Sequence, residues 1–315
     1  MTRTTSPACA SSAAYIPAAR AASTACGPRA RRAFVAVAVA VLLALSCVLT
    51  GCTSGGAATG SSAASAADGA SADQGSTLRV AMELAYPPFE TKDDAGNPEG
   101  LAVDFIRDFG TAYGYDVQIE NTAWDGLIPA LQTDKADLVI SSMTITDERK
   151  QSVDFSDAYA MAQLAILANA NSGVASIDDL NQPGKKVAVK TGSTGDVYAT
   201  KNLTNAEIVR LADESACVTE VVQGKADGFL YDQLTIYRNH QANPDTTEAV
   251  FIPFQDAEEW GIAVKKGNTA LLDQLNAFIA QSKTDGEFDR LTEKYLAEEK
   301  KAFDEYGFKW FFDFE

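Results

Sequence analysis

Short apolar runs recur through most of this chain, separated by stretches whose apolar residues repeat at helical spacing. The runs predict strands at residues 78–82, 115–119, 137–140, 164–167, 186–189, 208–211, 228–230 and 261–264. The stretches between them predict helices at residues 103–113, 126–132, 196–202, 214–223, 233–239 and 269–281. This alternation indicates an α/β fold with largely parallel sheets.

The beginning of the chain has a different pattern. Residues 33–49 are small or apolar and directly follow two arginines. The run is short for a membrane-spanning helix and fits the central region of a secretory signal peptide. It ends in the sequence LTGC at residues 49–52, which resembles the lipobox of bacterial lipoproteins. The resemblance implies that residues 1–51 are a signal peptide and that Cys52 carries lipid.

Two other interpretations of this region stay open. A signal anchor with an incidental cysteine would have a similar composition. The sequence Arg31-Arg32-Ala33-Phe34 faintly resembles a twin-arginine export signal, although the usual flanking residues are missing.

Residues 52–76 are expected to form a flexible linker, because after Cys52 they are almost entirely Ala, Gly, Ser and Thr. A linker of this composition spans about 25–30 Å root-mean-square. That length suits a tether between a membrane surface and a folded domain.

The charge of the chain excludes some partners. Residues 1–51 contain five basic and no acidic side chains, so the remainder has a net charge of −22. Such an acidic chain is unsuited to binding nucleic acid or to adsorbing directly on anionic lipid. Attachment to a membrane therefore has to come from the lipid at Cys52.

The cysteine and histidine content excludes further chemistry. Once the signal peptide is removed and Cys52 is lipidated, Cys217 is the single remaining thiol, so no internal disulfide is expected. Apolar neighbours at helical spacing predict that Cys217 is buried and structural. With His240 as the single histidine, we expect neither a metal site nor another cofactor.

The most informative motif for chemistry lies directly after the apolar strand at residues 137–140. Hydroxyl side chains at Ser142 and Thr144 precede a charged turn with one arginine, Arg149. A guanidinium can hold both oxygens of a carboxylate, and the ends of strands in α/β sheets are where ligands bind. Residues 190–196 follow a second strand in the same way, which suggests a cleft between two lobes.

Several segments resemble the polar amino-acid-binding proteins of ABC importers. They are LRVAMELAYPPFE at residues 78–90, WDGLIPALQ at 124–132 with ADL at 136–138, the stretch at 141–159, and residues 185–195 and 225–232. The similarity covers residues 77–300 in order and spacing. It implies a two-lobed, periplasmic-binding-protein-like fold of type II, in which two crossovers act as a hinge.

The resemblance also implies the domain limits. Lobe 1 would comprise residues 77–160 and 260–315, and lobe 2 residues 161–259, with crossovers near residues 159–163 and 256–260. The chain departs from the family pattern at residues 100–104. It departs again in an aromatic and acidic extension at residues 303–315, which we expect to pack against lobe 1.

Residue by residue, the resemblance assigns the ends of an α-amino acid. Arg149 would hold the ligand carboxylate with help from Ser142, Thr144, Ser193 and Thr194, and Asp232 would receive the α-ammonium. For Arg149 the alternative is a solvated side chain in a charged turn. For Asp232 the alternative is a helix N-cap, which is compatible with ligand binding.

The ligand side chain would be contacted by a second group of residues. Tyr86 and Trp124 match the aromatics that sandwich it, although either could instead pack in the core. Glu83 and Lys190 match positions at its distal end, where one acceptor and one donor favour glutamine-like ligands first. Lysine, arginine or ornithine come second, and a purely structural Glu83–Lys190 ion pair is a further alternative.

These expectations combine into one function. The chain would be a monomeric, lipid-anchored binding protein on the outer face of the cell membrane. It would capture an amino acid and deliver it to an ABC permease with its ATPase, without acting as an enzyme. Two alternatives are a cyclohexadienyl-type dehydratase on the same fold and an amino-acid-sensing surface receptor.

Overall fold

The structure, a computed structural model, describes residues 76–306 and 309–314. The expected signal peptide, the lipidation site Cys52 and the linker up to residue 75 lie outside these described residues. The first strand begins at Ser76, the last residue assigned to the linker. In the part of the chain that the structure describes, no helix is long and apolar enough to cross a membrane.

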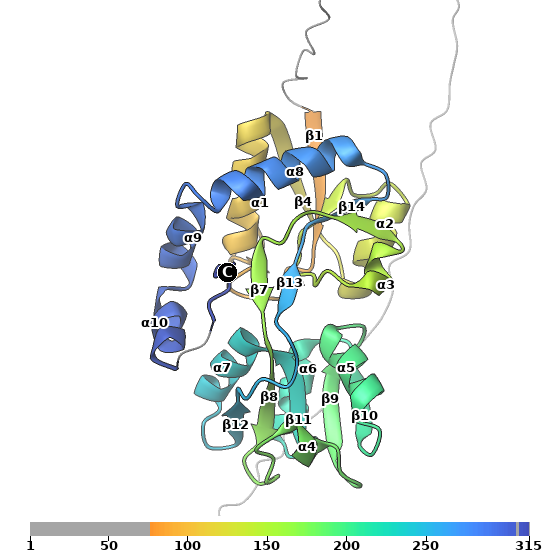
Figure 1. Cartoon of the computed structure of the whole chain (residues 1–315), viewed down its shortest axis with the longest axis vertical. Coiled ribbons are helices and arrows are strands. Elements are labelled where there is room, and N and C mark those ends of the chain that lie inside the picture. Colours follow the sequence, from red (N-terminus) through yellow and green to blue (C-terminus); the bar gives the residue numbers. More distant parts are fainter. Residues whose placement is uncertain (1–75, 307–308, 315) are drawn as a thin grey trace, which may run out of the picture. The chain divides into compact units, whose positions relative to one another are not determined.

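One five-stranded sheet is built from both ends of the described chain (Figure 1). Its strands, in spatial order, are β4 (Tyr115–Asn121), β1 (Ser76–Met82), β5 (Leu138–Val139), β14 (Ala263–Lys265) and β6 (Val153–Phe155). Its main helices are α1 (Leu101–Tyr113), α2 (Leu127–Gln132) and α8 (Thr269–Ser282). We call this part lobe 1.

A second five-stranded sheet has the same arrangement. Its strands, in spatial order, are β10 (Glu207–Leu211), β9 (Lys186–Lys190), β11 (Gly228–Asp232), β8 (Leu164–Asn169) and β12 (Thr247–Val250). Its helices are α4 (Ile177–Leu180), α5 (Thr194–Asn202), α6 (Glu214–Val222) and α7 (Gln233–Ala242). We call this part lobe 2. The common strand order is a structural repeat that the sequence did not reveal.

Both sheets are mixed, where the sequence predicted largely parallel sheets. In each, the three strands at one edge are parallel and the next two pairings are antiparallel. The antiparallel pairings arise because the chain enters β14 and β8 directly from the hinge strands. They therefore run opposite to the strands whose carboxyl ends face the hinge.

The hinge is a two-stranded antiparallel ribbon between the lobes. Strand β7 (Ala160–Ala162) pairs with β13 (Glu258–Trp260), and Met161 lies opposite Glu259. Figure 1 shows both strands between the two sheets. These strands coincide with the crossovers expected from the sequence, and the two-lobed fold is confirmed. The limits of the lobes at residues 160 and 260 stay a prediction.

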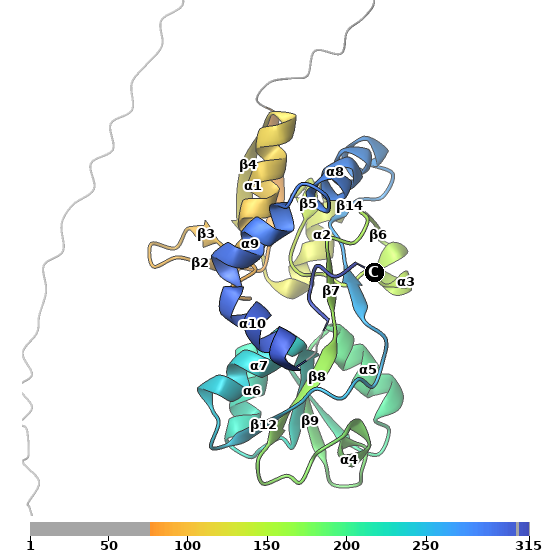
Figure 2. The ribbon, with the colours of Figure 1, turned by 60° about the vertical axis from the view of Figure 1, so that its left-hand side comes forward.

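The C-terminal segment packs over the hinge. Helices α9 (Glu287–Tyr295) and α10 (Ala297–Tyr306) are followed by residues 309–314 (Figure 2). Phe311 is fully buried, and its ring lies 5.1 Å from Phe89 and 5.5 Å from Trp260 between centroids. The backbone N–H of Met161 donates to the Phe311 carbonyl at 2.7 Å.

This segment also reaches lobe 2, which the sequence prediction did not include. Glu299 on α10 forms an ion pair with Arg238 on α7 at 3.6 Å. Phe303 packs edge-on against Tyr237 of the same helix. The extension thus contacts lobe 1, the hinge strand β7 and lobe 2.

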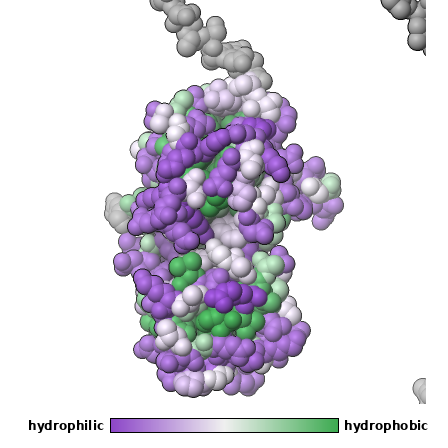
Figure 3. Space-filling view, turned by 90° about the vertical axis from the view of Figure 1, so that its right-hand side faces the viewer, coloured by the Kyte–Doolittle hydropathy of each residue, from purple (hydrophilic) through white to green (hydrophobic). Residues whose placement is uncertain are grey.

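Shorter elements complete the described chain: β2 (Thr91–Lys92), β3 (Pro98–Glu99), the 3-10 helix η1 (Trp124–Gly126) and α3 (Asp147–Lys150). Figure 3 shows hydrophilic side chains over most of one face and apolar surface mainly on its lower half. Among the described residues, the most exposed large hydrophobic side chains are Val197 and Ile252, at 52% and 62%.

Candidate ligand-binding site

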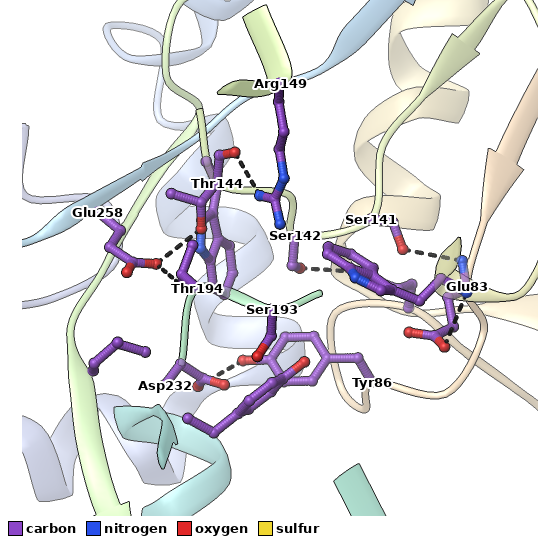
Figure 4. A pocket seen from close by; sticks show the side chains of 15 residues that line it. Glu83, Tyr86, Ser141, Ser142, Thr144, Arg149, Ser193, Thr194, Asp232 and Glu258 are labelled. Carbon is purple, nitrogen blue, oxygen red and sulfur yellow. Dashed lines mark hydrogen bonds between the residues drawn. The ribbon is translucent and has the colours of Figure 1, made fainter. Parts of the chain in front are cut away.

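A cavity lies between the lobes, at the carboxyl ends of β1, β5, β9 and β11 (Figure 4). The space between its lining atoms, including the part open to solvent, is ≈ 490 Å³. Nine of the ten predicted site residues line it: Glu83, Tyr86, Trp124, Ser142, Thr144, Arg149, Ser193, Thr194 and Asp232. The tenth, Lys190, lies behind Glu83, with which it forms an ion pair. The structure therefore brings all ten together; their contacts with a ligand stay a prediction.

Arg149 points into this cavity from the short helix α3. The hydroxyl of Thr146 caps α3 by accepting the Arg149 backbone N–H at 3.2 Å. The guanidinium donates to the Thr144 carbonyl at 2.7 Å and to the Gly192 carbonyl at 3.2 Å. Burial lowers the pKa of Arg149, but a guanidinium stays protonated. Since Arg149 forms no ion pair within the described chain, donors remain for a carboxylate.

Asp232 faces the cavity from the end of β11 and is also the N-cap of α7. Its Oδ1 accepts the Leu234 and Thr235 backbone N–H groups at 2.9 and 3.1 Å. The hydroxyl of Tyr86 donates to the same oxygen at 2.7 Å. The other oxygen, Oδ2, is buried and has no hydrogen-bond partner among the residues that the structure describes. Burial raises the pKa of Asp232, opposed by these hydrogen bonds, so Asp232 gains from a cationic partner.

Ser142 has a strained backbone at the wall of the cavity. Its φ is +47°, in the left-handed region that residues other than glycine seldom adopt. Its hydroxyl donates to Oε2 of Glu90 at 3.1 Å, and its N–H donates to the Tyr159 hydroxyl at 3.2 Å. Glu90 is 1% exposed, and burial raises its pKa well above the usual value.

Glu83 and Lys190 form an ion pair at the wall of the cavity. Their side chains are 14% and 3% exposed, the lowest pair of values among the ion pairs of the described chain. Glu83 also accepts the Trp124 backbone N–H at 3.3 Å. The Trp124 ring lies 5.2 Å from the Arg149 guanidinium and 5.4 Å from the Lys190 ammonium, within cation–π range.

Tyr86 packs in the core, which was the alternative that the sequence left open, and it also lines the cavity; its contact with a ligand side chain stays a prediction. Its ring is 6% exposed and packs against Phe89 at 5.6 Å and Trp260 at 5.9 Å, as a core residue would. It also lines the cavity and fixes Asp232 through its hydroxyl. Tyr86 is therefore both a core residue and a wall of the site.

Ser193 and Thr194 come from the start of α5 in lobe 2. The Ser193 hydroxyl is the N-cap of this helix and accepts the Asp196 N–H at 3.2 Å. The Thr194 hydroxyl donates to Oε2 of Glu258 at 2.7 Å, and the Thr144 hydroxyl donates to the same oxygen at 2.9 Å. A hydroxyl has one proton to donate, so both threonine protons are already used.

Sequence reasoning missed several residues that line the cavity, chiefly Glu90, Glu258, Tyr231 and Trp260. Glu90 ends the motif at residues 78–90, where an acid after an apolar run was a usable signal. Glu258 lies in the crossover, which was interpreted only as a connection. For Glu258 no local signal pointed to a place in the cavity.

Neither a metal centre nor a reactive thiol emerges from the described residues. No group of three or more His, Cys, Asp or Glu side chains among them is arranged to hold a metal ion. Cys217 on α6 is fully buried, and burial raises its pKa to about 12. A thiol with that pKa stays protonated and unreactive, which confirms the expected buried cysteine.

Two α/β lobes, a two-stranded hinge and a charged cavity between them define a protein that encloses a small solute. Comparison with known sequences agrees. The chain belongs to the bacterial extracellular solute-binding proteins, family 3, whose sequence profile matches residues 78–298.

Individual relatives give the same result. The chain is 36% identical over 232 residues to a probable histidine-binding protein of Neisseria gonorrhoeae, covering 73% of this chain and 86% of the relative. A solved ancestral arginine-binding protein with bound arginine is 36% identical, with a TM-score of 0.65, covering 70% of this chain and 98% of the other. An ancestral amino-acid-binding protein, described as a precursor of cyclohexadienyl dehydratase, is 39% identical. Its TM-score is 0.64, with coverage of 70% and 94%.

Proposed function

We propose that this chain captures a polar L-amino acid between its lobes and delivers it to an ABC importer. One observation carries the proposal: within the described part of the chain, the Arg149 guanidinium in the cavity has no ion-pair partner and a buried Asp232 oxygen has no hydrogen-bond partner. An α-amino acid supplies the carboxylate and the ammonium that satisfy these two groups. Relatives named for binding histidine and arginine support the same class of ligand.

The side chain of the ligand belongs to one of two classes in this proposal. Glutamine-like ligands would share the hydrogen-bonding capacity of Glu83 and Lys190. Basic ligands would be favoured by the acids that line the cavity, Glu83, Glu90 and Glu258 besides Asp232. Because Glu83 and Lys190 form an ion pair with each other, fewer of their hydrogen-bonding groups are free for a side-chain amide. Both classes of ligand are therefore included in the binding experiment below.

The cellular setting is part of the proposal. We place the protein outside the cytoplasm as a monomer, held at the outer face of the membrane by lipid on Cys52 after residues 1–51 are removed. Its partner would be an ABC permease with its ATPase. Mass spectrometry of the membrane-extracted protein tests the anchor, because an N-terminal fragment beginning at unmodified Cys52, or at any other residue, would contradict it.

A thermal-shift panel of amino acids on residues 77–315 tests ligand binding. A ligand at 100 times its Kd should stabilise the protein by about 2.7 kcal/mol. Arg149→Ala should abolish this shift, because the carboxylate loses its cation. Arg107→Ala, at an exposed position on α1, should retain it. Absence of a shift for every amino acid, or retention of the shift in Arg149→Ala, would contradict the proposal.

Dehydratase activity is the second candidate, because the cavity holds buried acids with raised pKa values, Glu90 and Asp232. The similarity to a dehydratase precursor points the same way. Incubation with a cyclohexadienyl acid distinguishes the two functions. A binding protein returns its ligand unchanged, whereas time-dependent loss of the substrate that Glu90→Gln abolishes would identify an enzyme.

A further inference from the structure

We propose that Glu258 is a positioning residue that latches the two lobes together through Thr194. The latch deepens the proposed function, since it would control how firmly the lobes close over the ligand. It consists of three side chains, Glu258, Thr144 and Thr194 (Figure 4), and we call it the hinge latch.

Glu258 and Thr144 form the fixed side of the latch. The loop that carries Thr144 is tied to β13 by backbone hydrogen bonds, from Ile145 N–H to Glu259 at 2.8 Å and from Gly261 N–H to Met143 at 3.0 Å. Gln255 donates to the second Glu258 oxygen at 2.7 Å. Thr144 therefore ties one oxygen of the Glu258 carboxylate to lobe 1, and Gln255 orients the other oxygen.

Thr194 forms the moving side of the latch. It is the first residue of α5 and belongs to lobe 2, whose sheet joins lobe 1 through the hinge. Hinge bending changes the distance from Thr194 to the Glu258 carboxylate. The 2.7 Å hydrogen bond therefore exists only when the lobes are closed, and it is strengthened by the charge of its acceptor.

The hinge latch lies at the edge of the cavity, where its side chains have a different role from the groups that contact the ligand. Its three side chains line both the cavity and a groove on the outer surface that extends to Asp147 and Glu259. They therefore form the wall between ligand and solvent. Because both hydroxyl protons point to Glu258, Thr144 and Thr194 do not donate to a ligand carboxylate while the latch is formed. They act through closure, and Arg149 provides the direct contact.

A double-mutant cycle tests the latch. Glu258→Ala and Thr194→Val should each raise the Kd of the amino acid found in the panel by about tenfold, equivalent to about 1.4 kcal/mol. The double variant should raise the Kd no further than Glu258→Ala alone, because the hydrogen bond between Glu258 and Thr194 is already lost in that protein. Glu259→Ala, at the exposed neighbouring position, should leave the Kd unchanged.

A second measurement follows closure directly. Fluorophores at Thr111→Cys and Lys201→Cys, exposed positions in lobes 1 and 2, report the distance between the lobes. Glu258→Ala should lower the energy transfer and so increase the open fraction, and Glu259→Ala should not. A residue that only supported the fold would not change the distance between the lobes, so its substitution would leave the energy transfer unchanged.

The opposite results would overturn the latch. If Glu258→Ala tightens binding, Glu258 competes with the ligand carboxylate. If the effects of Glu258→Ala and Thr194→Val on Kd add, the two side chains act independently. Failure of the proposed function is distinguishable: no amino acid would then shift the wild type. The energy transfer of the ligand-free variants would still decide whether Glu258 holds the lobes closed.

Discussion

Glu214 is a partly buried acid that should make the stability of the protein depend on pH. It is the first residue of α6, and its Oε2 is buried without a partner among the described residues. Burial raises the pKa of Glu214 to about 8. The positive charge of Lys190 lowers this pKa, and the negative charges of Asp232 and Glu83 raise it. In the unfolded chain a glutamate ionises near pH 4.3.

The free energy of unfolding should therefore fall as pH rises between about 4.3 and about 8. In this window the folded protein holds a proton on Glu214 that the unfolded chain has lost, so the stability present at lower pH is lost as pH rises. The slope from this one group is at most about 1.4 kcal/mol per pH unit. Urea unfolding of wild type and Glu214→Gln across this window measures it, and the variant should show a smaller slope.

Glu248→Gln, at an exposed position on β12, is the matched control and should retain the wild-type slope. Glu90 and Asp232 contribute a dependence of the same sign, because burial raises their pKa values too. The difference between the variants isolates Glu214. Equal slopes in wild type and Glu214→Gln would show that its carboxyl is ionised in the folded protein.

At the residue scale, the sequence predicted the groups that stand in continuous motifs. Arg149, Asp232 and Thr194 lie in segments that resemble the family, and the resemblance placed them at the site. Glu214 and Glu258 were not found, because their environment is created by segments distant in the sequence. An acid at the start of a helix or in a crossover is ordinarily a solvated residue, and only packing shows otherwise.

At the scale of elements, the C-terminal segment should contribute measurably to stability. Phe311 is fully buried among aromatic rings, and truncation of such a side chain ordinarily costs about 3–5 kcal/mol. Phe311→Ala should therefore lower the urea midpoint strongly. Phe314→Ala, at a half-buried position, should have a smaller effect. Equal effects would show that Phe311 packs less tightly in solution than in this structure.

Elements that lie in an apolar run were predictable, including the two-residue strand β5, whereas helices α9 and α10 and the hinge strands were not. Strands such as β1 and β9 are apolar runs buried by helices, and their periodicity identifies them. The hinge strands β7 and β13 have three residues each, too few for a periodic signal. Among the described strands, β6 pairs with β14 alone, and β14 lies more than 100 residues later in the chain, so no local pattern could place β6.

At the scale of the whole molecule, the two lobes differ in how the chain builds them. The buried residues of the apolar clusters inside lobe 2 lie between residues 165 and 236, and their partly buried neighbours extend to Phe254. The core of lobe 1 joins residues from both ends, including Val80, Leu275 and Phe311. Lobe 2 is therefore continuous in the chain, and lobe 1 is not.

A fragment of residues 161–259 should consequently fold by itself, whereas residues 76–160 should not. The first contains every strand of its sheet, and the second lacks β14, which separates β5 from β6. Circular dichroism during urea titration should show a cooperative transition for the first fragment and none for the second. A cooperative transition for residues 76–160 would contradict this explanation.

The hydrogen bond from Met161 to Phe311 has a consequence for self-association. A two-stranded ribbon has an outer edge on each strand, and exposed edges invite pairing with strands of other molecules. The terminal segment occupies part of the β7 edge with its own backbone and surrounds it with buried aromatic rings. The hinge can thus stay narrow enough to bend without presenting a free β7 edge to a neighbouring molecule.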